Sequence, residues 1–139
     1  MVVAAQVKRV TVRQLVLGES MLGRALRQYQ AHAAVHAAID YNDPASVQAG
    51  NEAAIQMRKI AGRIGSKGEQ AIEEFARFLE EPANDLCLWA AFHLLEVMTA
   101  PTELVDRAFE VLEQQSLEDD VAAFATRTRL RELRKLYGK

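Results

Sequence analysis

The chain has 139 residues, half of them hydrophobic, and a formal net charge of −2. This length allows one domain with a buried core, and seven glycines and three prolines leave little room for a disordered linker. The single cysteine excludes an internal disulfide, and no stretch has the apolar length of a membrane-spanning helix, so we expect a cytoplasmic protein that does not bind membranes.

The charges are arranged in blocks along the chain. Residues 1–68 carry more basic than acidic residues, whereas residues 69–120 hold fourteen acidic residues and only two basic ones. The last nineteen residues are basic again, with six basic residues and one acidic one. Because the acidic block repels phosphates, it argues against nucleic acid as the partner of that surface.

Every strongly periodic segment has the spacing of a helix, and we find no convincing strand. A capping-box pattern that begins at Thr11 predicts a helix from there to about Tyr41. Asp43, followed by Pro44, has the pattern of a helix cap with a first-turn proline and predicts a second helix to about Ile64.

Four further helices are expected after a glycine-rich break. A second capping-box pattern at Ser66 and Glu69 predicts a helix to about Glu81, and Asn84 or Asp85 is expected to cap the helix after it. The last two helices are expected from Pro101 to about Gln115 and from a cap within residues 116–119 to near Gly138.

The second half of the chain repeats weakly with a period of 34 residues. Helix pairs of this period stack on one another, so we predict an all-α fold, a short irregular α-solenoid of about six helices. We expect one domain over residues 1–139, with residues 1–10 as a candidate flexible segment. The matched pairs are Glu69/Glu103, Ala71/Val105, Phe75/Phe109, Phe78/Leu112, Ala90/Phe124 and Ala91/Ala125.

Several segments resemble a family of small bacterial HEAT-like helical domains. They are GRIGSKGEQAIEEFARFLEEP, LCLWAAFHLLEV, a helix that ends in VLEQQ, and TRLRELRK, and the part WAAFHLL is the most specific. The resemblance covers about residues 25–136. It implies a HEAT-like fold without catalytic residues, and a role like that of immunity proteins, which bind and neutralise one cognate secreted bacterial toxin.

Two local motifs indicate other functions. His32, His36 and Asp40 share one helix face and could hold a divalent metal, but no other ligand cluster accompanies them, so we expect no metal. The turn Ile64–Glu69 is similar to the GxxG loop with which KH domains hold RNA. A KH domain also needs a sheet, and the next helix is acidic, so an ordinary helix-ending turn is the favoured interpretation. RNA binding through this turn stays as the alternative.

The helices expected over residues 67–81 and 101–115 each have an apolar face and an acidic face. An ordinary solvated surface is one interpretation, and an electrostatic match to a basic partner is the other, which we favour. The stripe Arg127, Arg131 and Arg134 could bind nucleic acid, but we expect it to pair with the acidic helix beside it. The acidic candidates for partner binding are Glu73, Glu74, Glu80, Glu81, Glu103, Asp106, Glu110 and Glu113.

The segment LCLWAAFHLLEVM, residues 86–98, is apolar nearly all round, which is typical of a helix packed on several sides. Cys87 lies on a different face from His93, which argues against a Cys–His dyad. Trp89, His93 and Glu96 form the one break in the apolar surface, at a spacing of four and three residues. They are predicted to be either the edge of the core, which we favour, or an anchor for a binding partner.

No motif of an enzyme is present: we find no supported Ser/His/Asp or Cys/His arrangement, phosphate-binding loop or dinucleotide fingerprint. We therefore expect a protein-binding module without a cofactor. The most specific prediction is an immunity protein, or antitoxin, whose acidic helical face occludes the basic cleft of a secreted toxin. A helical scaffold or regulatory protein is a further alternative.

Overall fold

The computed structural model describes residues 20–139, and this part of the chain contains helices and no strand. The predicted all-α class is therefore confirmed for these residues, while the helix start expected at Thr11 and the segment 1–10 lie outside them. The α-helices are α2 (Met21–Ala37), α3 (Pro44–Gly65), α4 (Glu69–Ala76), α5 (Leu86–Glu96), α6 (Thr102–Ser116) and α7 (Val121–Tyr137). Two 3-10 turns, η1 (Arg77–Glu80) and η2 (Ala83–Asp85), connect α4 to α5.

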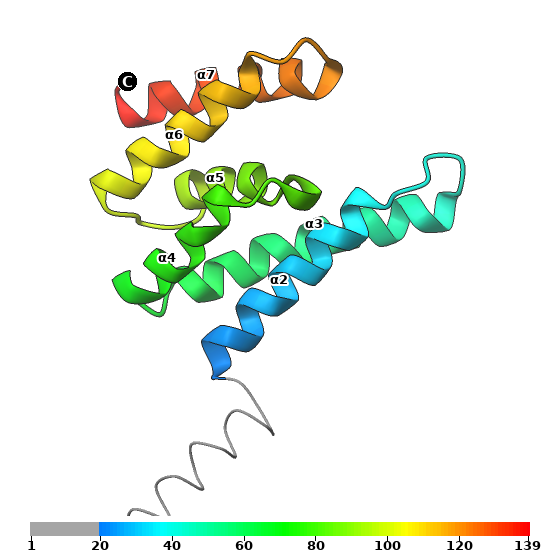
Figure 1. Cartoon of the computed structure of the whole chain (residues 1–139), viewed down its shortest axis with the longest axis horizontal. Helices are drawn as coiled ribbons and strands as arrows, with labels where there is room; N and C mark the ends of the chain where they lie inside the picture. Colours follow the sequence, from blue (N-terminus) through cyan, green and yellow to red (C-terminus); the bar gives the residue numbers. More distant parts are fainter. Residues whose placement is uncertain (1–19) are drawn as a thin grey trace, which may run out of the picture.

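Helices that are neighbours in the sequence are also neighbours in space. α2 packs along α3, and α6 packs between α5 and α7 (Figure 1). The α2–α3 pair and the α6–α7 pair lie at opposite ends of the molecule, with α5 between them and α4 beside the end of α3 (Figure 1). The two ends therefore present separate surfaces.

The apolar sequence of α5 fits the central position of this helix in the fold. It contacts α2, α3, α4 and α6, and eight of its eleven residues are buried. Its own Leu94 is fully buried, as are Phe75, Ile64 and Leu112 of the neighbouring helices. A helix with neighbours on several sides needs apolar side chains on several faces, as predicted for this segment.

Two predicted helix ends are confirmed by their caps. The Asp43 side chain accepts a hydrogen bond from the backbone amide of Ala45 at 3.0 Å, and Pro44 is the first residue of α3. At the other end of the chain, Gly138 has a left-handed backbone with φ of 67° and ends α7.

Other predicted boundaries are wrong by a few residues. α2 ends at Ala37 and not near Tyr41, because Asp40 folds the chain into a turn by accepting from the amide of Asn42. α7 is capped by Asp120, which accepts from the amide of Ala123 at 2.7 Å, and not by a residue of the 116–119 segment.

The helix predicted over residues 67–81 is shorter than expected. Ser66 ends α3, and α4 begins after Gly68, whose φ of 109° suits glycine alone, so the predicted capping box does not form. The helix tightens into η1 before Pro82, which has no amide hydrogen to continue it. Asn84 and Asp85 have positive φ values, and the Asp85 side chain makes no cap.

The 34-residue repeat holds for the first helix of each pair and fails for the second. Phe75 of α4 and the matching Phe109 of α6 are both buried. Ala90 of α5 is fully buried, whereas the matching Phe124 of α7 is exposed. The difference follows from position, because α7 has a neighbouring helix on one side only.

Candidate functional site

The outer surface of α6 carries a row of carboxylates. Glu103, Asp106, Glu110 and Glu113 are exposed, and their spacing of three and four residues places them on one stripe, here named the α6 ridge. The opposite side of α6 packs into the core through Leu104, Val105, Ala108, Phe109 and Leu112. Val111, also apolar, is only half-buried.

α7 and the last residue of the chain together neutralise half of the α6 ridge. Lys139 Nζ lies 2.8 Å from Asp106 Oδ1, and an Arg134 guanidinium nitrogen lies 2.8 Å from Glu113 Oε1. Glu103 and Glu110 have no ion-pair partner within residues 20–139. The ridge therefore presents two carboxylates to an outside partner and two that already hold cations.

Glu110 stands between two grooves. On one side, a groove of about 290 Å³ separates α6 from η1 and is lined by Glu80 and Arg107 as well as Glu110. On the other side, a groove of about 410 Å³ runs between α6 and α7 past Arg134. A partner that lies across both grooves would therefore contact Glu110 at the centre of its interface.

The acidic residues of α4, η1 and the residue after it have different surroundings. Glu80 lies 3.4 Å from Arg107 of α6 and so joins the surface around the ridge, while Glu74 pairs with Arg77 at 3.2 Å. Glu81 accepts from the amide of Ala83 and thereby shapes the turn before α5. Glu73 is exposed, and the described residues give it no ion pair.

His93 lies inside the protein and not at its surface. It is 3% exposed, and its Nδ1 lies 2.6 Å from the hydroxyl of Tyr29, which is fully buried. Burial, together with the charge of the nearby Arg58, lowers the pKa of His93 to about 4, so the ring is neutral at pH 7. Burial also raises the pKa of Tyr29, so the hydroxyl keeps its proton and can donate a hydrogen bond to Nδ1.

Trp89 covers this buried pair from the outside. Its ring stacks on His93 at a centroid distance of 5.9 Å and meets His36 of α2 edge-on at 4.9 Å. Trp89 is half-buried, so part of its surface is open to solvent. These contacts are those of a core edge, and a partner contact through Trp89 stays a prediction.

Glu96 joins three helices. Both of its carboxylate oxygens accept from Arg129 of α7, at 2.7 and 2.8 Å, and one also accepts from Arg58 of α3 at 3.1 Å. Burial raises the pKa of Glu96, but the hydrogen bonds from Arg129 and Arg58 outweigh this effect and lower it. The Arg129 guanidinium also lies 3.7 Å from the centre of the Phe92 ring. Within the chain, Glu96 therefore ties α7 to α3 and α5.

The other chemical candidates have structural explanations. Within the described part of the chain, no three His, Cys, Asp or Glu side chains, His32, His36 and Asp40 included, are grouped closely enough to hold a metal ion. Cys87 is a buried free thiol whose pKa is raised by burial. In the KH-like turn, a Cβ atom at Gly65 would lie 3.0 Å from Met98 Cγ, so this glycine makes room for the close approach of Met98.

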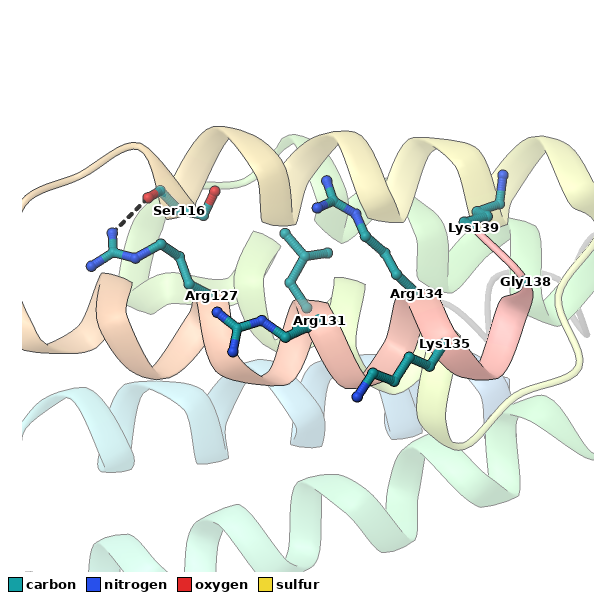
Figure 2. Close-up of a pocket in the computed structure, with 8 residues that line it drawn as sticks. Ser116, Arg127, Arg131, Arg134, Lys135, Gly138 and Lys139 are labelled. Atoms are coloured by element: carbon teal, nitrogen blue, oxygen red, sulfur yellow. Dashed lines mark hydrogen bonds between the residues drawn. The ribbon is translucent and has the colours of Figure 1, made fainter.

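The basic stripe of α7 is largely occupied by internal contacts. A groove of about 510 Å³ runs along it, lined by Arg127, Arg131, Arg134, Lys135 and Lys139. Arg127 donates to the carbonyls of Ser116 and Glu118 at the end of α6. Figure 2 shows Arg134 and Lys139 reaching toward α6, whereas Lys135 points away from it. The predicted pairing with the acidic helix is thus confirmed for Arg134, while Arg131 and Lys135 have no ion pair within residues 20–139.

The sequence reading missed an apolar patch at the connection between α6 and α7. Leu117, Val121 and Phe124 are 78%, 87% and 66% exposed, which is unusual for large apolar side chains this close in sequence. Leu117 shares a groove with Glu110 and Glu113, so the patch adjoins the α6 ridge. The repeat concealed the patch because it matched Phe124 with the buried Ala90.

A comparison of the chain with models of protein families, with curated proteins and with solved structures found no match. Among the helices of residues 20–139, none combines the length and apolar character needed to cross a membrane.

Proposed function

We propose that this protein is a non-catalytic binding module that uses the α6 ridge to engage a basic surface on a partner protein. In its most specific form it is an immunity protein, built as a short HEAT-like solenoid, that occludes a secreted bacterial toxin. The observation that carries the proposal is the position of Glu110, unpaired and exposed between two grooves. The resemblance of residues 25–136 to HEAT-like immunity proteins supports the choice of partner.

The unpaired carboxylates suit a role in association. Charges at the rim of an interface act mainly on the rate of encounter, and they do so most strongly at low salt. Glu103 and Glu110 can act in this way without first giving up an internal ion pair. Asp106 and Glu113 would have to exchange Lys139 and Arg134 for cations of the partner.

The apolar patch offers large side chains that can be buried against a partner, which the carboxylates of the ridge cannot. Most binding energy at protein interfaces comes from a few large side chains that lose water on binding. Leu117, Val121 and Phe124 are exposed beside the ridge and fit this role. We therefore expect a partner surface with a basic row that ends in an apolar depression.

Co-purification, followed by a stopped-flow measurement of the association rate with the purified partner, tests the proposal. The full chain is expressed with an affinity tag beside the toxin candidate encoded by the neighbouring gene, in the wild type and in the double variant Glu103→Lys/Glu110→Lys. We expect the ridge variant to associate at least about tenfold more slowly at low salt, with unchanged helical circular dichroism. The matched control is Glu52→Lys/Glu132→Lys, which reverses two exposed carboxylates on α3 and α7.

The two parts of the proposal fail in different ways. If the ridge variant associates with the partner as fast as the control does, the α6 ridge is not the contact surface. If the wild-type chain binds no toxin candidate, the immunity role is wrong.

A further inference from the structure

A groove at the far end of the molecule from α7 is lined by basic residues. It lies where the start of α2 meets the end of α3, because these helices run in opposite directions (Figure 1). The groove has a volume of about 200 Å³ and is lined by Met21, Arg24, Ala25, Gln28, Arg63 and Lys67. All of its charged lining residues are cations. We name Arg24, Arg63 and Lys67 the basic corner.

The cations of the basic corner make no polar side-chain contacts with the rest of the described chain. Arg24, Arg63 and Lys67 are all exposed, and none has an ion pair or hydrogen bond from its side chain within the described residues. On α7, by contrast, Arg129 and Arg134 each hold a carboxylate. The corner thus differs from the α6–α7 surface, where Arg134 and Lys139 each pair with a carboxylate of α6.

The acidic residues of this helix pair lie away from the groove along the chain. Asp40 and Asp43 belong to the connection between α2 and α3, and Glu52 to the first half of α3. The groove is at the other end of both helices. Like charges that share a groove repel one another, and a bound anion relieves this repulsion.

The groove suits a compact anion better than an extended one. Guanidinium groups bind phosphate oxygens in pairs, and lysine adds a point charge. None of the lining residues is aromatic, so the groove offers no ring on which a nucleobase can stack. Two residues beyond Lys67, Glu69 begins the acidic block, which repels a long phosphate chain.

We propose that the basic corner binds a compact polyanion of two or three linked phosphates, as in inorganic triphosphate or the phosphate end of a nucleotide. Arg24 and Arg63 line the groove from two helices, and Lys67 lines it from the turn that follows α3. This binding does not involve the α6 ridge and is independent of the proposed partner.

Calorimetric titration of the full chain with sodium triphosphate at low ionic strength tests this proposal. We expect saturable one-to-one binding that weakens at least about tenfold in the double variant Arg24→Gln/Arg63→Gln. The matched control, Arg131→Gln/Lys135→Gln, removes two exposed and unpaired cations from α7 and should bind as the wild type does. All four side chains are exposed, and a thermal melt by circular dichroism checks that each variant folds.

Three outcomes overturn the proposal. The first is the absence of saturable binding to the wild type. The second is an equal loss in both double variants, which would mean that only the net charge matters. The third is an oligouridylate RNA that binds the same two arginines more tightly than triphosphate, which would assign the corner to the backbone of a nucleic acid.

Discussion

α5 and α7 occupy matching places in the repeat, yet they meet different surroundings. α5 is buried on nearly every side, whereas α7 buries Ala123, Thr126, Leu130 and Leu133 on one face and exposes the opposite face. Apolar residues are found on both helices, but on α7 several of them, such as Val121 and Leu136, face solvent. The number of neighbouring helices, and not local hydrophobicity, therefore decides which apolar residues form the core.

The largest expected loss of stability comes from a substitution in α5. Leu94 is fully buried, so Leu94→Ala should lower the free energy of unfolding by about 3 to 5 kcal/mol through lost contacts and a residual cavity. The same change at the exposed Leu136 of α7 should cost less than about 0.5 kcal/mol. Urea unfolding of both variants measures the difference, and similar losses would contradict the contrast between the two helices.

The next largest change in stability is a pH dependence that comes from the buried histidine of α5. Because the folded state lowers the pKa of His93 from 6.5 to about 4, the unfolded chain takes up a proton first as the pH falls. Stability from this group is fully present above pH 6.5 and is lost between there and about pH 4, amounting to about 3 kcal/mol. In His93→Gln this part of the pH dependence should disappear. Urea melts of the wild type and of His93→Gln across this pH range give, for each protein, the slope of the free energy of unfolding against pH. Equal slopes would show that His93 is not the source of this pH dependence.

A smaller effect tests the link between the two helices. Glu96→Gln removes the charge that holds Arg58 and Arg129, so α7 should be attached less firmly. We expect a loss of about 1 kcal/mol, because both arginines are about half exposed and water screens the pairs. Hydrogen exchange should show faster opening of α7 than in the matched control Glu132→Gln. If the two variants exchange alike, Glu96 does not secure α7.

The smallest effect on stability is expected on the outer face of α7. Phe124→Ser should change the free energy of unfolding by less than about 0.5 kcal/mol, because the ring is 66% exposed. If the apolar patch anchors the partner, the same change should speed dissociation of the complex at least about tenfold. Surface plasmon resonance on the captured partner measures this rate, and Ile55→Ser on α3 serves as the control. An unchanged dissociation rate would exclude Phe124 as an anchor.

The sequence by itself determined the helical class, most helix positions and the central place of residues 86–98. These features depend on spacing within one segment: apolar residues every three or four positions, Asp43 before Pro44, and Gly138 at a helix end. The stripe of carboxylates on α6 was visible for the same reason. Helix ends were less predictable where Gly68 and Asp120 took over from the expected caps.

Only the tertiary structure decided which of these side chains are free. Asp106 and Glu110 look alike in the sequence, but Lys139 lies beside the first, and no cation of the described chain pairs with the second. The hydrogen bond of Tyr29 with His93 joins residues 64 positions apart, and the basic corner joins two helix ends. Local periodicity sets the face on which a side chain lies, whereas its partner depends on which helix packs against that face.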